Sequence, residues 1–492
     1  MPTARRNPRR PSPARTLRGA ASSRVLAGAG AVGRLSADHA ADAAPRQTAL
    51  RVGYPLPGLW PMRGCPVITR LEALNFGVLR TVDVRLDAFH VLVGPNGSGK
   101  STLLDVIAFI GDTLRVGPRA AVLGEPAAGV RTRASDARDL VWRRDAPYFD
   151  LAVELAIPSH LGARVPGFET ARYELSVDID PHDGRIGFQA ETLWLVPPRS
   201  SEPARSVQEL FPSLREAPRH VAHLPKQKAP SGWRRVVKKI PEGGNDYFRS
   251  ETSGWNNQFR LGPERSALGN LPEDEDKFPV ATWVKRVFQE SLQRLVLGAE
   301  RLRDPSPPGA SRSFQPDGSN LPWVAHELER IDPARVERWV KDVATAVPGL
   351  SFLRTVEREE DRHRYLVLEY DDQYEAPSWV VSDGTLRLLA LTLLAHLPDN
   401  EGLFLVEEPE NGVHPRAVET LVASLSSVYD GQVLCASHSP VALRAVEPSQ
   451  LLCFAVGSDG AADVVRGDEH PTLHKWQGEA DLGTLFAAGV LG

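Results

Sequence analysis

One short segment determines how the rest of this 492-residue chain is interpreted: Gly94-Pro95-Asn96-Gly97-Ser98-Gly99-Lys100-Ser101, followed by Thr102. The apolar run His90-Val91-Leu92-Val93 precedes it, and an apolar helical pattern follows it. Glycines at this spacing before a Lys-Ser pair, between a strand and a helix, are typical of a phosphate-binding loop. Backbone N–H groups in such a loop turn inward, and the helix N-terminus adds a positive dipole. The segment therefore predicts a cradle for the phosphates of a nucleotide.

Two side chains of this loop have specific expected roles. Lys100 is expected to reach the β- and γ-phosphates and to act in catalysis, and the Ser101 hydroxyl is expected to ligate Mg²⁺. A chance glycine-rich turn is the alternative, but it does not account for the strand and helix on either side. The residues expected to bind the nucleotide here are Gly94, Pro95, Asn96, Gly97, Ser98, Gly99, Lys100, Ser101 and Thr102.

A second apolar run, Leu403-Phe404-Leu405-Val406, ends in the paired acids Glu407 and Glu408. Two carboxylates at the tip of a buried strand are costly unless they meet a metal ion or water. We expect Glu407 to hold the Mg²⁺ and Glu408 to polarise the attacking water as a general base. Alternatively, the pair is an ordinary acidic loop after a strand.

A third apolar run, residues 432–436, leads to His438. This run is the next expected strand after the one that ends in Glu407 and Glu408, and His438 lies at its tip. That position favours a catalytic role in which His438 senses the γ-phosphate. The alternative is a histidine that is satisfied at the surface or in the core.

The segment Val381-Ser382-Asp383-Gly384-Thr385 leads into the helical pattern 386–396. Ser382 is a typical helix N-cap, and it need be nothing more. The same helix end is also a second candidate anion site, formed by Ser382 and Gly384.

These four motifs, in this order, resemble the ABC-type ATPase head of the SMC/RecF/OLD-like group, AAA-family ATP-binding proteins of DNA-repair and phage-defence loci. The resemblance covers most of residues 66–455. It implies ATP and Mg²⁺ as cofactors and a homodimer in which Ser382 and Gly384 contact the ATP held by the other subunit. Two departures are Glu407, where most ABC heads have Asp, and S-D-G-T, where transporters have S-G-G-Q. No glutamine of a Q-loop is found in the segment 136–148.

The resemblance implies an ATP-hydrolysing switch that dimerises on ATP and controls a partner effector or nucleic acid, in phage defence or DNA repair. One alternative is a non-hydrolysing regulatory or scaffold subunit in which ATP serves to hold a complex together. A transport ATPase is the less favoured alternative. Few residues follow His438, and they carry no D-x-D cluster, so we expect a separately encoded effector to supply any nuclease or toxin activity.

The patterns along the chain predict an α/β P-loop fold whose core is split by a helical and loop-rich insertion. Strands are expected at 67–71, 82–86, 90–93, 149–157, 173–179, 365–370, 402–406 and 432–436, and helices at 101–110, 281–297, 323–331, 336–347, 385–396, 417–428 and near 482. A loop is expected over 111–140, and residues 197–280 show little periodicity. The expected parts are 62–196 (N-terminal core), 197–350 (insertion) and 351–492 (C-terminal core).

Charge divides the chain unevenly. Residues 1–61 hold ten arginines and two acids, a formal charge of +8, so residues 62–492 carry −12 of the total −4. We expect a basic disordered tail before Met62, or a translation start near Met62. Three cysteines without a CxxC pair favour a reducing cytoplasm, and no run is apolar and long enough for a membrane helix.

A basic segment stands out within the acidic remainder. No acidic residue lies between Arg219 and Ile240, and Trp233 lies among the cations Arg219, Lys226, Lys228, Arg234, Arg235, Lys238 and Lys239. Such a mixture suits contact with phosphates and stacking on a base. A solvated flexible loop is the alternative.

Overall fold

We describe a computed structural model of the chain for residues 67–199, 208, 210–213, 216–241, 244–398, 400–475 and 481–491. The predicted tail or alternative start in residues 1–61, together with Met62 and Cys65, lies outside these residues.

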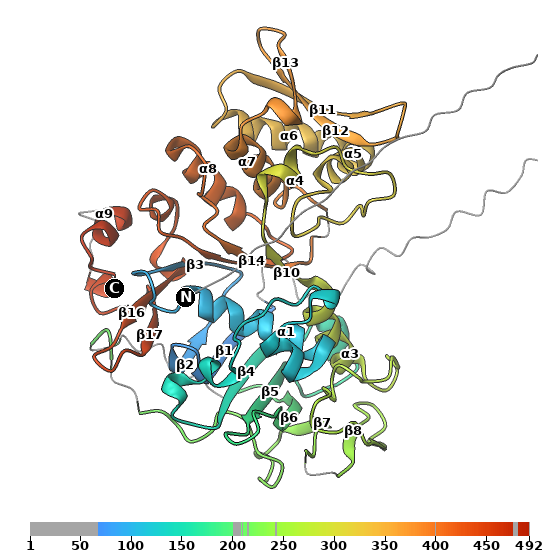
Figure 1. Cartoon of the computed structure of the whole chain (residues 1–492), viewed down its shortest axis with the longest axis vertical. Helices are drawn as coiled ribbons and strands as arrows, with labels where there is room; N and C mark the ends of the chain where they lie inside the picture. The colour runs from blue at the N-terminus through green and yellow to red at the C-terminus, as the bar shows by residue number, and fades with distance from the viewer. Residues whose placement is uncertain are drawn as a thin grey trace, which may run out of the picture. The chain divides into compact units, whose positions relative to one another are not determined.

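The first layer is an eight-stranded antiparallel sheet in the order β2-β1-β4-β5-β6-β7-β8-β9 (Figure 1). Its strands are β1 (Ile68–Phe76), β2 (Leu79–Arg85), β4 (Tyr148–Ala156), β5 (Thr170–Ile179), β6 (Ile186–Val196), β7 (Arg234–Lys238), β8 (Asp246–Arg249) and β9 (Asn256–Phe259). β2 shows the period of two that a half-buried strand requires, because Val82 and Val84 are buried while Asp83 between them is exposed.

The second layer is a six-stranded sheet in the order β10-β14-β15-β3-β16-β17. Its strands are β3 (Phe89–Val93), β10 (Leu292–Leu295), β14 (Leu403–Glu407), β15 (Gln432–Ala436), β16 (Leu451–Val456) and β17 (Ala462–Arg466). All neighbours pair in parallel except β16 with β17. β3 and β15 are buried along their whole length, as parallel strands covered on both faces are.

The long helix α1 (Lys100–Leu123) joins these two layers. Its apolar side chains belong to one core with residues of both sheets, such as Phe149 of β4 and Leu434 of β15. The rings of Phe76, Phe109 and Phe149 lie 5.2–5.5 Å apart in this core. α1 is kinked at Gly117, before Pro118, which cannot donate a helical hydrogen bond.

The opposite face of the six-stranded sheet packs on a second core. This core includes α7 (Asp383–Leu393) and α8 (Pro415–Ser426), with Phe404 and Val433 of the sheet. It continues into a three-stranded sheet of β11 (Leu350–Glu357), β12 (Arg364–Tyr370) and β13 (Glu375–Pro377). The remaining α-helices are α2 (Ser159–Gly162), α3 (Pro279–Arg286), α4 (Ala299–Arg303), α5 (Leu321–Ile331), α6 (Pro333–Ala344) and α9 (Leu482–Ala487).

The short helical turns are η1 (Pro126–Ala128), η2 (Ala137–Leu140), η3 (Trp142–Arg144), η4 (Val287–Ser291, a π-helix), η5 (Ser378–Val380), η6 (Ala442–Ala445), η7 (Pro448–Gln450) and η8 (Leu473–Lys475). Within the described part of the chain, no helix is both long and apolar enough to cross a bilayer.

The predicted α/β class with a split core is confirmed. β3 pairs with β15, Phe89 lying opposite Val433, although the two strands are far apart in the sequence. The buried side chain of Gln432 ties the two parts together, because it accepts a hydrogen bond from the Ile68 amide at 2.9 Å and donates to the Ile68 carbonyl at 2.8 Å.

Three expectations about elements are wrong. α1 continues to Leu123, so residues 111–123 are helical and not loop. The predicted helix 281–297 ends at Arg286, and after η4 the chain forms strand β10, an edge strand too short to show a period. Residues 234–259, expected in the insertion, extend the first sheet as β7, β8 and β9. The proposed division at 196/197 therefore separates strands of one sheet.

Candidate nucleotide-binding site

The loop of residues 94–101 connects the end of β3 to the first turn of α1. Its geometry depends on glycine at two positions in particular. Gly94 has φ of +148°, and a Cβ there would lie 2.4 Å from the carbonyl oxygen of Phe454 on β16. Gly99 has φ of +100° immediately before the helix, where a side chain would be strained. The loop therefore lies close against β16, and its last residues form the N-terminus of α1.

Lys100 is folded back over this loop. Its Nζ donates hydrogen bonds of 2.8 Å to the carbonyl oxygens of Gly94 and Pro95. Burial lowers the pKa of Lys100 to about 8, although the negative charge of Glu408 opposes the shift. Pro95, Asn96 and Gly97 at the loop's tip are exposed.

Ser98 and Thr102 lie at the inner side of the loop. Ser98 is fully buried, and its Oγ has no hydrogen-bond partner among the described residues. Its hydroxyl is thus free to serve a phosphate oxygen in the cradle. Thr102 lies on the first turn of α1, next to the turn at Gly77.

Ser101 and Glu407 meet, although they are far apart in the sequence. The Ser101 hydroxyl donates a 2.5 Å hydrogen bond to Oε2 of Glu407, the last residue of β14. Parallel pairing through β15 places the ends of β3 and β14 at one edge of the sheet. A hydroxyl and a carboxylate oxygen are hard ligands of the kind that Mg²⁺ takes, and Mg²⁺ obtains its other ligands from water and phosphate. The donor set thus fits Mg²⁺ bound together with a nucleotide.

The sequence patterns did not identify Arg294, which also contacts this acid. Arg294 lies on β10, beside β14, and its guanidinium forms an ion pair with Oε1 of Glu407. The same guanidinium lies 3.8 Å from Asp105 on α1, which also pairs with Arg131 and Arg133. Glu407 is thus held by a hydroxyl on one oxygen and a cation on the other. No sequence signal marked Arg294, because β10 lies in a stretch with a helical pattern.

Glu408 follows directly and is exposed. Its φ is +47°, a conformation uncommon for a non-glycine residue, and its amide donates to the Ala436 carbonyl at 2.9 Å. Strained conformations of this kind persist where the surrounding structure imposes them and are frequent at active sites. Arg387 of α7 faces this acid and Glu410: burial lowers the pKa of Arg387, and the charges of Glu410 and Glu408 oppose that shift.

His438 lies just beyond β15, with an exposed side chain. Its amide donates a 2.9 Å hydrogen bond to Oε1 of Glu410, and the Ser437 hydroxyl donates to the same oxygen at 2.8 Å. The turn after β15 is therefore attached to the turn after β14. The imidazole itself is at the same strand-end edge as Glu408.

Ser382 is the N-cap of α7. Its Oγ accepts a 3.2 Å hydrogen bond from the Thr385 amide, so the N-cap interpretation holds in this chain. Gly384 packs tightly on the turn that follows Glu410, because a Cβ there would lie 2.2 Å from the Gly412 carbonyl oxygen. Among the described hydrogen bonds, none joins Ser382 or Gly384 to the loop 94–101. The described hydrogen bonds of this helix end are thus local to α7.

A cavity of about 640 Å³ adjoins Ser101 and Thr102. Its far wall is the turn Trp142-Arg143-Arg144, in the segment where no Q-loop glutamine was found. Arg143 and Arg144 have φ of +48° and +57°, and the turn is held by ion pairing of Arg144 with Asp139. Phe76 lines the cavity, but its ring belongs to the core and is fully buried.

Comparison with known proteins gives one family and several structures. Residues 89–444 match the family model described as "AAA domain, putative AbiEii toxin, Type IV TA system". No curated protein matches the chain.

Three solved structures are similar to the chain, each at low identity. A Smc head bound to the C-winged helix domain of ScpA is 15% identical with a TM-score of 0.46, over 81% of this chain and 97% of that chain. The SMC head domain from Thermotoga maritima is 11% identical with a TM-score of 0.38, over 81% and 98%. A Smc head domain with an extended coiled coil, bound to the C-terminal domain of ScpA derived from Pyrococcus furiosus, is 14% identical with a TM-score of 0.42, over 81% and 96%.

Proposed function

Since the chain belongs to the family of AAA domains described as putative AbiEii toxin, Type IV TA system, we propose that it is an ATPase that binds ATP with Mg²⁺, dimerises on ATP and controls a partner effector. The observation that carries this proposal is the 2.5 Å hydrogen bond between Ser101 and Glu407. It brings the end of the phosphate loop and the tip of the acidic strand to one point, which hydrolysis of a phosphoric anhydride requires.

The site residues have distinct proposed roles. Ser101 and Glu407 hold Mg²⁺, which when bound neutralises charge on the phosphates. Lys100 leaves the carbonyl oxygens of its own loop and donates to the β- and γ-phosphates, and Glu408 accepts a proton from the attacking water. His438 contacts the γ-phosphate.

The cavity beside Thr102 is the proposed place for the base and ribose. It is large enough for part of a nucleotide, and it opens next to the residues that follow the phosphate loop. Ser382 and Gly384 are proposed to complete the ATP site of a second copy. The family description places related domains in toxin–antitoxin systems, so we propose phage defence as the setting, with DNA repair as the second candidate.

Two variants test the activity. Lys100→Ala should reduce ATP binding and bring phosphate release to background, because the only cationic side chain proposed to contact the β- and γ-phosphates is lost. Glu408→Gln should retain ATP binding but lower turnover by roughly a hundredfold or more, the usual scale of general-base catalysis. ATP binding is measured by calorimetry, and turnover by phosphate release. Wild-type turnover in both variants would refute the assignment.

A sizing experiment separates the main proposal from a non-hydrolysing regulatory subunit. The wild-type chain is run with ATP and Mg²⁺, and phosphate release is measured in the same sample. Dimerisation with turnover supports the ATPase switch. Dimerisation without turnover supports the regulatory subunit, in which ATP only holds the complex together.

A further inference from the structure

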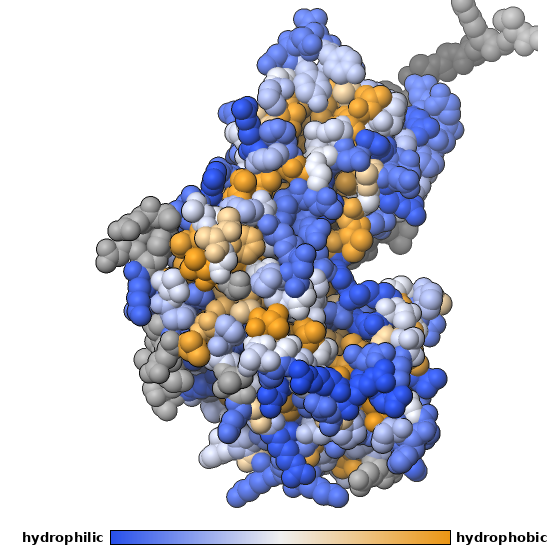
Figure 2. All heavy atoms as spheres, turned by 60° about the vertical axis from the view of Figure 1, so that its left-hand side comes forward, coloured by the Kyte–Doolittle hydropathy of each residue, from blue (hydrophilic) through white to orange (hydrophobic). Residues whose placement is uncertain are grey.

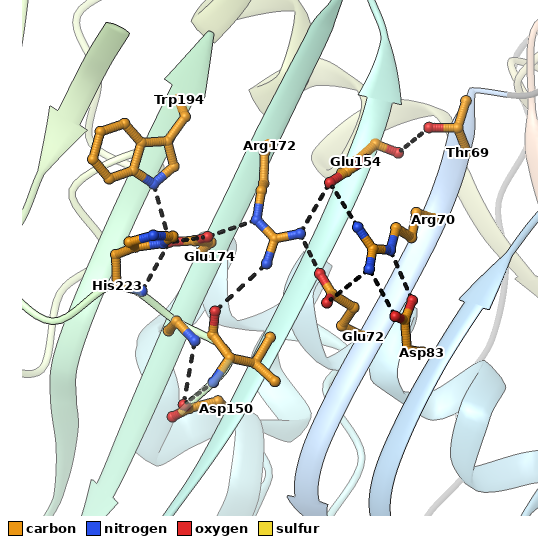
Figure 3. Close-up of polar contacts among 12 residues, drawn as sticks. Thr69, Arg70, Glu72, Asp83, Asp150, Glu154, Arg172, Glu174, Trp194 and His223 are labelled. Carbon is orange, nitrogen blue, oxygen red and sulfur yellow. Dashed lines mark hydrogen bonds and ion pairs between the residues drawn. The ribbon is translucent and has the colours of Figure 1, made fainter. Parts of the chain in front are cut away.

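The basic segment 219–239 is attached to the first sheet by its backbone. Asp150 of β4, which is fully buried, accepts hydrogen bonds from the amides of Val221 at 2.9 Å and Ala222 at 3.3 Å. Glu174 of β5 accepts from the amide of His223 at 3.0 Å and from its Nδ1 at 2.9 Å. Figure 3 shows these acids reaching the segment from neighbouring strands. These hydrogen bonds hold residues 221–223 on the sheet, and we call the segment 219–239 the strap.

A network of charges on the sheet supports the strap. Arg172 donates to Glu174 at 2.6 Å and to Glu154 at 3.0 Å, and also pairs with Glu72, as Figure 3 shows. Arg172 also donates to the Val221 carbonyl, so the network reaches the strap backbone directly. Arg172 and the backbone amides are the hydrogen-bond partners of these buried acids, although the charge of Glu174 also acts on Arg235.

The end of the strap forms β7, where the pairing with β6 is irregular and Val236 and Val237 are both buried. From Val237 onward the side chains alternate between two environments. Val237, Lys239 and Phe248 point into the protein and are at most 1% exposed. Lys239 pairs with buried Asp246 at 3.3 Å, so it does not belong to the surface. The intervening residues face outward: Lys238 lies opposite Tyr247, and Arg249 lies opposite Asn256.

These outward side chains line a shallow hollow of about 250 Å³, which we call the β7–β9 surface: Arg235, Lys238, Tyr247, Arg249 and Asn256, with Val236 at its base. Arg235 is held in place by stacking over the Trp194 ring, 4.3 Å from its centroid. Burial lowers the pKa of Lys238, and the positive charge of Arg235 lowers it further. Two cations are thus held close together, and an anion placed between them would relieve their repulsion.

The segment that carries this surface is also basic, although the acidic run Glu273 to Asp276 lies beside the 250–252 turn. In the described residues 216–241 and 244–265, the exposed acids are Glu216 and Glu264, whereas the exposed cations are Arg219, Lys226, Lys228, Arg249, Arg260 and Arg265. In Figure 2, mostly hydrophilic residues cover the lower part of the molecule, the end at which Figure 1 places β7 and β8. This concentration of positive charge lies in a part of the chain, residues 62–492, that carries −12 overall.

An aromatic side chain completes the arrangement. Trp255, in the turn between β8 and β9, is 77% exposed, and its carbonyl accepts a 2.8 Å hydrogen bond from the Ser250 amide, which fixes the turn. Trp255 directly precedes Asn256, which lines the hollow. A large exposed indole at this position is suited to stacking on an unpaired base, whereas the bases of a duplex are not available for stacking.

We propose that the β7–β9 surface binds single-stranded nucleic acid, with phosphates on Arg235, Lys238 and Arg249 and a base stacked on Trp255. Phosphate contacts supply affinity without regard to sequence, and the indole accepts any base face, so the binding has little sequence preference. This function is additional to ATP turnover, because none of the four residues belongs to the nucleotide site.

The test is fluorescence anisotropy of a short labelled oligothymidine or oligouridine with the full chain, at several salt concentrations. Combined Arg235→Gln, Lys238→Gln and Arg249→Gln should weaken binding roughly tenfold or more, and should reduce the steepness of the salt dependence by about two. Trp255→Ala should weaken binding without changing the salt dependence.

A matched control removes three exposed cations elsewhere: Arg338→Gln, Lys341→Gln and Arg362→Gln. This control should bind like the wild type, and all variants should keep the wild-type urea unfolding transition, which shows that they fold. Three outcomes would each overturn the proposal. The first is equal weakening by the three-residue control variant, and the second is unchanged binding in both the three-residue β7–β9 variant and Trp255→Ala. The third is a preference for a blunt duplex over the single strand. These outcomes do not depend on whether the chain hydrolyses ATP.

Discussion

Arg294 is the residue that most directly opposes a metal ion at Glu407. Its guanidinium occupies one carboxylate oxygen while Ser101 occupies the other, so a divalent cation must compete with it. A partly exposed ion pair contributes about 1 kcal/mol. Arg294→Ala should therefore lower the Mg²⁺ concentration for half-maximal ATP binding by roughly fivefold. Titration of Mg²⁺ against a fluorescent ATP analogue measures this concentration.

The conservative variant Arg294→Lys is the control, because it retains the charge on β10. It should keep a Mg²⁺ requirement close to that of the wild type. If Arg294→Ala instead raised the Mg²⁺ requirement, Arg294 would be positioning Glu407 for the metal rather than competing with it.

Among the elements, β5 carries the buried acid on which the strap depends. Glu174 accepts hydrogen bonds from Arg172, from the Trp194 indole at 3.0 Å and from His223. Glu174→Gln removes the negative charge and places an amide group against these donors. The positive charge of buried Arg172 then has one carboxylate fewer to balance it. Breaking a buried pair in this way costs about 3 kcal/mol. The free energy of unfolding in urea should fall by that amount, whereas Glu169→Gln should leave it nearly unchanged.

The same acid predicts a dependence on pH. Burial alone would raise the pKa of Glu174, but the hydrogen bond from His223 and the charge of Arg172 outweigh it and lower the pKa below its ordinary value of 4.5. The ionised form is thus stabilised in the folded chain. Its contribution is fully present above pH 4.5 and is lost as the pH falls through the lowered pKa. The stability difference between the wild type and Glu174→Gln should therefore be constant near neutrality and shrink in acid. Melting temperatures of the two proteins, measured from neutral pH to below pH 4.5, would show this difference.

The elements that the sequence predicted well are those with a single dominant pattern. β3, β14 and β15 are buried in a parallel sheet and are mostly apolar along their length, so the strand ends that lead to Ser101, Glu407 and His438 were predictable. β10 was not, because Gln293 and Arg294 interrupt a four-residue edge strand. β7 to β9 have basic and polar outer faces, and their strand character comes from pairing with β6 and with each other. The contact of Arg294 with Glu407 likewise exists only because β10 pairs with β14, and nothing local in the sequence encodes it.

For the whole molecule, the predicted resemblance to P-loop ATPase heads is confirmed by the family match over residues 89–444. The second anion site at Ser382 stays a prediction, and in the described residues no hydrogen bond joins Ser382 to the phosphate loop of its own chain. An ATP-bound dimer would give it a partner, and such a dimer contains two equivalent sites by symmetry. The exposed position of Ser382 and Asp383 at the start of α7 is compatible with contact by another chain.

Mixing two inactive variants tests whether those sites are shared between chains. Lys100→Ala disables the phosphate loop, and Ser382→Asp keeps an N-cap for α7 but directs a negative charge at the partner's phosphates. In an equal mixture, half of the dimers pair one variant with the other, and each of these has one intact site of two, so turnover should recover to about a quarter of the wild-type value. Each variant alone should stay near background in the same phosphate-release assay. If the mixture remains at background while both variants dimerise, Ser382 does not act on the partner's ATP. If Ser382→Asp alone keeps wild-type turnover, α7 contributes only its cap, and the active unit need not be a dimer.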